Sequence, residues 1–311
     1  MAISNLTKIG IAKEAPWAGT ADPEYLIPVD PPTIGEQSEQ ILDEAVRGLA
    51  TKDYAAYQGV RRVEGTFSGS FYPEECGLLL YSIMGATSFT AGSPNTHTFS
   101  VGSHPPSLTI QDENQVESQR FVACMVSELT LSFNAAEGLL RYSATIIGRE
   151  RTDTIAGAVP AEATNAPFCG WQMACAIGGA SFGKLIDGEI TLRRPIELGY
   201  MASGSQYAGT ADAGPLEVTA RATIRYDTQA DYDRYLDKDQ DSFQIDWNRG
   251  SGATQKKLTF LATSMDFGDG PMEIDRSGAS LTGAYAMRAL YNTTDDGPCK
   301  FTLLNARDSK Y

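Results

Sequence analysis

The sequence lacks long hydrophobic runs, and no apolar stretch approaches the roughly eighteen residues that a membrane helix needs. The first residues, MAISNLTKIGIAKEAPW, interrupt a short apolar stretch with lysines, which is unlike a signal peptide. These absences lead us to expect a protein that is made and kept in a cytoplasm-like compartment.

The sequence also lacks closely paired cysteines and has little histidine. An odd number of cysteines at irregular spacing predicts buried free thiols in place of disulfides; they are Cys76, Cys124, Cys169, Cys175 and Cys299. The two histidines, His97 and His104, are expected in a loop rich in Ser, Pro and Gly. Because zinc sites combine tight cysteine pairs with histidines, we expect no metal and no cofactor.

Basic residues are outnumbered, and the net charge is −14. Holding nucleic acid through its phosphates requires basic patches, so the charge argues against a DNA-binding protein. One interpretation is simply solubility. Another is a surface that must not retain DNA passing close by.

Recognisable catalytic motifs are absent from the sequence as well: it has no G-x-S-x-G, no H-E-x-x-H and no dinucleotide fingerprint. Residues 178–185, GGASFGKL, begin like a phosphate-binding loop, but Leu185 stands where Ser or Thr is needed and a strand pattern follows. Residues 237–242, DKDQDS, begin like a calcium loop, but Ser242 replaces the glycine and Asn248 the final glutamate. We interpret them as a glycine-rich turn and a solvated acidic turn. We therefore predict that the protein has no catalytic residues and is not an enzyme.

What the sequence does contain is a strand pattern that runs directly into a helix. In VEGTFSGSFYPEECGLLLYSIMG, apolar residues and glycines alternate with polar residues from Val63 to Phe71, which predicts a half-buried strand. Pro73 suits the first turn of a helix, and Gly85 suits its end. The pattern therefore predicts a helix over 74–84.

The same order of patterns returns 153 residues later, in LEVTARATIRYDTQADYDRYL. Alternation over 216–224 predicts a second strand, and Asp227 is a suitable N-cap for a helix over 228–237. This repeat indicates a mainly β chain of two tandem domains, each with one α-helix. We expect the first over 1–151, a linker rich in Ala, Thr and Pro over 152–167, and the second over 168–311.

Two long polar connections, 35–59 and 199–214, precede the strand-helix units at equivalent places. Loops of this length commonly have a function, although a plain surface insertion is the alternative. We expect them to form an interface through residues that are typical of interfaces, namely Tyr54, Tyr57, Tyr200, Met201 and Tyr207.

Several segments together resemble the major tail proteins, or tail tube proteins, of long flexible-tailed bacteriophages. The resemblance runs from about residue 8 to about residue 290 and follows KEAPWAGTADPEYLIPV, the strand-helix unit at 63–85, PSLTIQDE, NAAEGLLRYSATIIG and PFCGWQMACAIGG. It implies that each domain is an antiparallel β-sandwich or partial barrel with one flanking α-helix. It also implies a structural subunit that polymerises into stacked rings, with the connections 35–59 and 199–214 at the contacts between rings, and hence the tube through which DNA is ejected into the host. The implied location is the virion tail, after assembly in the host cytoplasm.

The resemblance also implies partners: other copies of the chain, the tape measure protein, and the tail tip and terminator proteins, with DNA passing through the lumen without specific binding. Single-domain members form six-fold rings, so a two-domain chain is expected to form a pseudo-six-fold ring of three. If residues 151–311 instead form a separate outer domain, six chains are needed.

The lumen is expected to be polar and acidic with few Lys or Arg, so that DNA can slide; which strands line it does not follow from the alternation. Two other classes stay open at this point. One is a non-polymerising tandem β-sandwich that decorates a virion or binds carbohydrate, and the other is an enzyme with a site between the domains.

Overall fold

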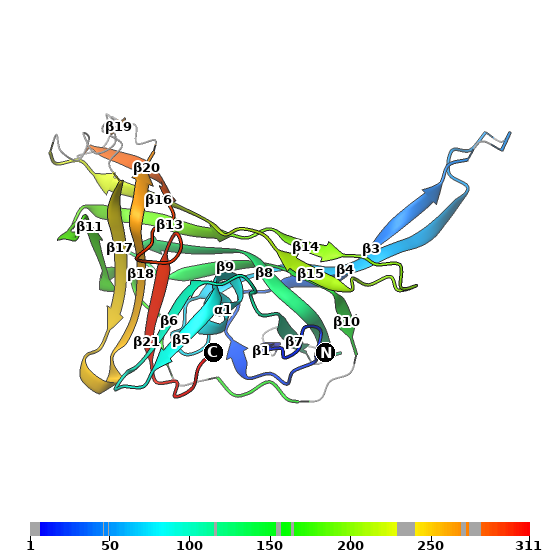
Figure 1. The fold of residues 1–311 in the computed structure, drawn as a ribbon, viewed down its shortest axis with the longest axis horizontal. Helices are drawn as coiled ribbons and strands as arrows, with labels where there is room; N and C mark the ends of the chain where they lie inside the picture. The colour runs from blue at the N-terminus through cyan, green and yellow to red at the C-terminus, as the bar shows by residue number, and fades with distance from the viewer. Residues whose placement is uncertain are drawn as a thin grey trace.

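The structure is a computed structural model that describes residues 7–311 except 46, 49, 115–116, 154–156, 163–164, 229–239, 269–271 and 274–280. It is built mainly of antiparallel strands, as predicted (Figure 1). The elements are β1 (Lys8–Lys13), β2 (Tyr25–Ile27), β3 (Thr33–Asp43), β4 (Ala55–Ser70), α1 (Gly77–Met84), β5 (Gly85–Thr90), β6 (Asn95–Val101), β7 (Leu108–Glu113), β8 (Gln119–Asn134), β9 (Arg141–Gly148), β10 (Glu150–Thr152), η2 (Gly170–Gln172), β11 (Met173–Ile177), β12 (Ala180–Ser181), β13 (Leu185–Arg193), β14 (Ile196–Gly199), β15 (Thr210–Ala213), β16 (Glu217–Arg225), β17 (Gln240–Arg249), η3 (Gly252–Thr254), β18 (Lys256–Phe267), β19 (Met272–Glu273), β20 (Thr282–Ala289) and β21 (Lys300–Asn305).

The first strand-helix unit is β4 followed by α1, and its alternation has the expected consequence: Val63 and Phe67 are buried while Glu64 and Thr66 are exposed. The helix begins at Gly77, three residues later than predicted, because residues 73–76 form hydrogen-bonded turns first. It ends as predicted, since Gly85 takes φ +92° and donates its N–H to the carbonyl of Tyr81.

The second unit begins with β16, whose burial alternates from end to end, as predicted for 216–224. The helix predicted over 228–237 lies outside the described residues, apart from residue 228.

The connection expected as a loop over 35–59 is instead most of a β-hairpin. Strands β3 and β4 pair from Thr33 opposite Thr66 to Asp43 opposite Ala55, and they extend away from the body as an arm, here residues 36–61 (Figure 1). Because both faces of the arm meet solvent, no apolar alternation is needed to form it, which is why the sequence suggested a loop. The connection over 199–214 contains β15, which pairs with β14, so that only 200–209 is a loop.

The same strand order occurs in both halves of the chain. The first half runs β3-β4-β9-β8-β7-β1, and the second runs β13-β16-β20-β18-β17-β11, with every pairing antiparallel. The arm, which is the outer part of the β3–β4 hairpin, and the β14–β15 hairpin also stand at corresponding places: the arm joins the inner parts of β3 and β4, and β14–β15 joins β13 and β16.

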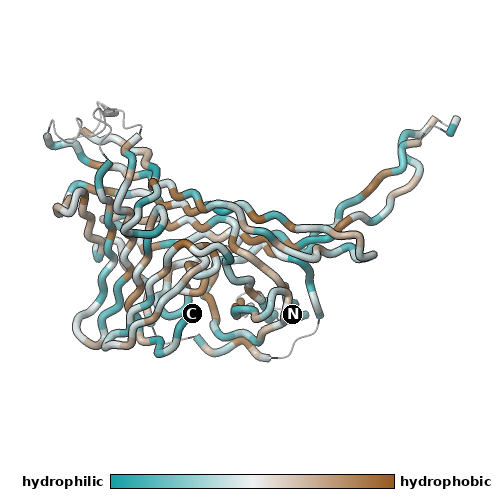
Figure 2. Tube along the Cα trace, in the orientation of Figure 1, coloured by the Kyte–Doolittle hydropathy of each residue, from teal (hydrophilic) through white to brown (hydrophobic). Residues whose placement is uncertain are grey.

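The two halves are joined by strand pairing in two places. Strand β8 pairs with β13, from Glu128 opposite Arg193 to Asn134 opposite Asp187, and β6 pairs with β21. One hydrophobic cluster includes residues of both halves, and Figure 2 shows its apolar positions alternating with polar ones along the strands. Fully buried members are Leu79, Leu131, Ile190, Phe260 and Phe301.

Within the segment predicted as a linker, 157–162 and 165–167 contain no helix or strand. They nevertheless lie against the first half: the Val159 N–H donates to the Glu113 carboxylate at 2.9 Å, and the Asn165 side chain donates to Glu75 at 2.8 Å. These two hydrogen bonds therefore hold the segment against the first half of the chain.

The cysteines are all free, and four of the five are buried, as predicted; Cys169 is half-buried. His97 is a correction: it lies on β6 with its side chain in the core, because the strand pattern of residues 95–101 extends through it. His104 does lie in a loop. No helix in the described part of the chain is long and apolar enough to cross a membrane.

Candidate assembly surfaces

The arm exposes apolar side chains on a segment that has no core to bury them. Ile41 and Tyr57 lie directly opposite each other across the hairpin, 52% and 59% exposed, and the adjacent Leu42 is 46% exposed. Figure 2 shows apolar stretches along this hairpin. Clustered apolar exposure of this kind is typical of interaction surfaces.

The base of the arm is held by the 200–209 loop. The Arg61 backbone N–H donates to the Gln206 carbonyl at 2.9 Å, and the Gln206 side chain donates to the Gly59 carbonyl at 3.1 Å. The Tyr200 hydroxyl donates to the Arg61 carbonyl at 3.1 Å. These bonds pair the outer edge of β4 with the loop, so they fix the direction in which the arm leaves the body.

The side chains at this base form a polar layer. Burial raises the pKa of Tyr200, and burial likewise raises the pKa of Tyr207, whose hydroxyl accepts a bond from Arg61 at 3.5 Å. Beside them, a hydrogen bond from Arg62 to Glu64 at 2.6 Å raises the pKa of that arginine. Both tyrosines therefore stay neutral at physiological pH and act as hydrogen-bonding contact groups.

The five predicted interface residues divide between two places. Tyr200 and Tyr207 gather at the arm base with Met201 nearby on the loop, 57% exposed. Tyr57 lies farther out, and Tyr54 lies near the tip beneath the guanidinium of Arg47, 5.0 Å from its ring centre. Sequence reasoning missed Ile41 and Leu42, although an apolar pair inside the polar run GEQSEQILDEA was the available signal.

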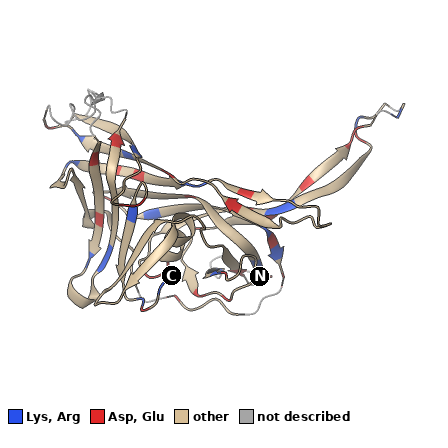
Figure 3. Ribbon diagram, viewed as in Figure 1, with Lys and Arg blue, Asp and Glu red and all other residues tan. Residues whose placement is uncertain are grey.

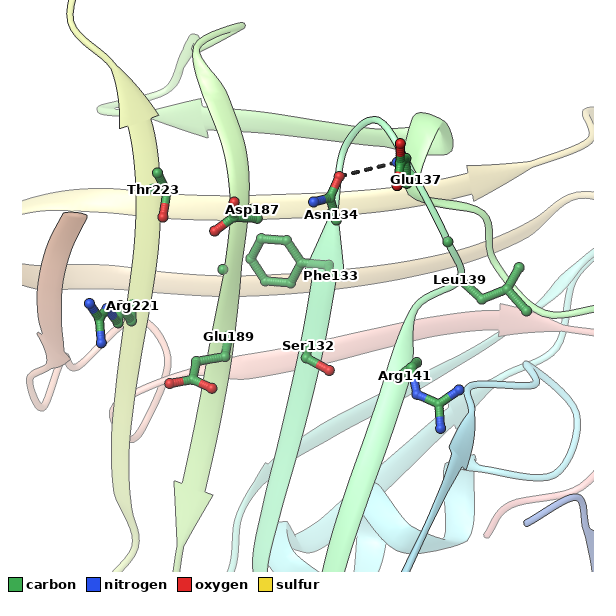
Figure 4. Close-up of a pocket in the computed structure, with 12 residues that line it drawn as sticks. Ser132, Phe133, Asn134, Glu137, Leu139, Arg141, Asp187, Glu189, Arg221 and Thr223 are labelled. Atoms are coloured by element: carbon green, nitrogen blue, oxygen red, sulfur yellow. Dashed lines mark hydrogen bonds between the residues drawn. The ribbon is translucent and has the colours of Figure 1, made fainter. Parts of the chain in front are cut away.

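A second surface is the exposed face of the sheet that runs through β4, β9, β8, β13, β16 and β20, here called the sheet face. Its far side carries the hydrophobic core. Three shallow cavities lie on this face, and the first, about 580 Å³, is shown in Figure 4. Side chains lining it from neighbouring strands are Ser132, Asn134, Asp187, Glu189, Arg221 and Thr223.

Asn134, which lines the cavity in Figure 4, has a structural role. The Asn134 side-chain oxygen accepts the backbone N–H groups of Ala136 and Glu137, at 2.9 and 3.1 Å, and so stabilises the turn between β8 and β9. The carboxylates and the arginine are spread over an open sheet surface. Among the described residues, no group of three His, Cys, Asp or Glu side chains could hold a metal ion.

The glycine-rich motif forms the turn expected of it, whereas the described part of the acidic motif, residues 240–242, is strand and not the expected turn. Gly178 and Gly179, with φ +60° and +76°, form the turn between β11 and β12, and Leu185 begins a strand. Of the acidic segment 237–242, residues 237–239 lie outside the described residues, and Ser242 is in β17.

The chain matches a family model described as phage tail tube protein over residues 4–289. No curated protein matches it.

Proposed function

Since the chain belongs to the phage tail tube protein family and is a structural subunit of the tube in a virion tail, we propose that three copies of it close into each ring of that tube. The family match favours this role over the non-polymerising decoration or carbohydrate-binding module. Self-assembly is thus the function, and the finer proposals below concern its geometry.

The observation that carries the proposal is the repeated strand order. Each half of the chain has six strands arranged in the same order. The β8–β13 pairing already joins one half to the other within the chain. Single-unit members are expected to close with six units, so two units per chain give three chains. Six chains per ring is the alternative.

The internal junction also indicates how chains meet. In the repeat, β13 corresponds to β3, and β8 corresponds to β18 with its continuation β19. Among the described residues, β3 pairs only with β4. We therefore propose that β3 of one chain pairs with the β18–β19 edge of its neighbour, as β13 pairs with β8. Closure of this kind removes the free edge that would otherwise promote aggregation.

We propose that the arm reaches the neighbouring ring along the tube, where Ile41, Leu42 and Tyr57 become buried. The test replaces residues 40–58 with Asn-Gly, which closes the shortened hairpin with a tight turn between Glu39 and Gly59, whose backbones lie side by side. We expect a folded protein that does not form long tubes in electron micrographs, because the arm lies outside the core.

Gln40→Ser is the matched control, since Gln40 lies on the arm beside Ile41 and has an exposed side chain. It should leave tube length unchanged. Full-length tubes from the shortened chain would contradict a role for the arm in stacking.

We further propose that the tube encloses the tape measure protein, ends at the tip and terminator proteins, and assembles in the host cytoplasm. DNA then passes through the lumen without specific binding, and the chain has no catalytic activity. The incomplete phosphate-binding motif supports this last point: Lys184→Ala should leave tube formation and phage viability unchanged, and loss of a nucleotide-dependent activity in that variant would contradict it.

A further inference from the structure

The sheet face is the less covered of the two sides of the sheet. Helix α1 lies on the core side of the sheet, where the Ser82 hydroxyl meets the β8 backbone at 3.4 Å (Figure 1). No second layer covers the other side among the described residues, and the shallow cavities lie there. If sheets that are paired edge to edge close around an axis, the sheet face fits the narrow interior, and the side that carries α1 and the core must point outward.

The middle of the sheet face is a continuous row of hydroxyl groups. Strand register places residues from five strands next to each other in the order Ser68, Ser143, Thr130, Thr191, Thr219. The Oγ1 atoms of Thr130 and Thr191 are 3.2 Å apart, across the junction of the two halves. This row carries no charge and crosses both halves of the chain.

Arginines flank the hydroxyl row, but carboxylates neutralise almost all of them. Glu217 binds Arg288 at 2.6 Å, and Glu128 lies 4.0 Å from Arg193, in each case from another strand. Three further arginines of this face are also paired, namely Arg62 with Glu64, Arg141 with Asp30 and Arg225 with Asp227. Figure 3 shows acidic and basic positions interspersed on these strands.

The charge of the sheet face therefore differs from that of the whole chain. On these strands, six arginines and five carboxylates share the face with the hydroxyl row, whereas the net charge of the chain is −14. The arginines are Arg62, Arg141, Arg193, Arg221, Arg225 and Arg288, and the carboxylates are Glu64, Glu128, Asp187, Glu189 and Glu217. The expectation of a strongly acidic surface with few arginines does not describe this face. Its neutrality comes from ion pairs.

We infer that the sheet face lines the bore of the tube, and that its cross-strand carboxylates keep the arginines from holding the phosphates of double-stranded DNA. An arginine with a carboxylate at 3–4 Å presents a dipole to a passing phosphate, and the attraction falls off faster than that of a bare charge. Unpaired arginines would release counterions from DNA and hold it in a salt-dependent way. The inference rests on the proposed tube.

The test frees two arginines at once with Glu128→Gln/Glu217→Gln, which adds two net positive charges per chain. Exposed ion pairs contribute less than about 1 kcal/mol each, so the variant should fold. Tubes of wild type and variant are sedimented with a labelled 20-base-pair duplex at 50 and 300 mM salt. We expect the variant to retain at least about tenfold more duplex than wild type at low salt and to lose the excess at high salt.

The matched control is Glu24→Gln/Glu117→Gln, which makes the same charge change at two ion pairs outside the sheet face. It should retain no more duplex than wild type. If the Glu128→Gln/Glu217→Gln variant does not form tubes, Glu64→Gln, which frees Arg62 on the same face, takes its place. Equal retention by the sheet-face variant and the control would overturn the inference, whereas failure of wild type to form tubes would overturn the proposed function instead.

Discussion

Arg194 follows β13 and is a buried arginine without a carboxylate partner among the described residues, and its removal should destabilise the fold markedly. Its side chain is 4% exposed and donates to the carbonyls of Ile83 and Met84 at 3.3 Å, at the end of α1. It also donates to the carbonyls of Gly102 at 2.8 Å and Gly214 at 2.9 Å. Burial lowers its pKa, but an arginine remains charged at any physiological pH.

The expected magnitude follows from those four acceptors. The oxygen of Ile83 is bonded in a buried environment, and leaving it without that partner costs about 1–3 kcal/mol, whereas the oxygen of Met84 keeps the Gly102 N–H at 2.8 Å. The other two bonds are only partly buried, so water can replace the guanidinium there. A favourable interaction of the cation with the C-terminal end of α1 is lost as well. Arg194→Ala should therefore lower the free energy of unfolding by about 2–4 kcal/mol.

The assay is thermal unfolding of unpolymerised protein, followed by circular dichroism and by the fluorescence of the buried Trp247. The expected fall in Tm is about 3–6 °C. Arg193→Ala is the control from the next position, because that side chain is 71% exposed and lies 4.0 Å from its carboxylate, which makes it worth less than about 1 kcal/mol. Arg194→Lys should rescue little, since one ammonium cannot reach four carbonyls. Equal Tm values for Arg194→Ala and Arg193→Ala would refute this reasoning.

Two further predictions concern buried titratable groups. Burial lowers the pKa of His97 below its usual 6.5, so below about pH 6.5 the unfolded chain takes up a proton that the folded chain does not, and the free energy of unfolding should fall. In urea unfolding, the loss of unfolding free energy between pH 7 and pH 5 should be smaller for His97→Phe than for wild type, and an equal loss would contradict this. Burial raises the pKa of Cys76, Cys124, Cys175 and Cys299. A thiol reagent at pH 8 should therefore label at most Cys169 rapidly in the native chain, and all five cysteines after denaturation. Rapid labelling of three or more thiols in the native chain would contradict their burial.

The strand-helix unit could be predicted from sequence because its burial is one-sided. Alternation at 63–71 and 216–224 reflects strands with one face in the core, and Gly85 marks a helix end that requires positive φ. The helix start was less predictable, since the turns at residues 73–76 satisfy the same hydrogen bonds that an early first turn would. Local periodicity thus identifies elements whose environment differs between two faces.

The arm and the junction of the halves were not predictable for the opposite reason. The arm has solvent on both faces, so its strands leave no periodic signal, and only the apolar Ile41 and Leu42 mark it. The pairing of β8 with β13 joins residues some sixty positions apart, and alternation says nothing about the choice of partner. The hydroxyl row and the Glu128–Arg193 pair depend on that register, and therefore become visible only in three dimensions.

The central claim, that one chain supplies two units of a six-position ring, is tested most directly by the symmetry of the assembled tube in electron cryomicroscopy. The account predicts three chains per ring, two similar units per chain, and β3 of each chain paired with the β18–β19 edge of the next. Six identical chains per ring, with the second half of each chain outside the wall, would contradict it.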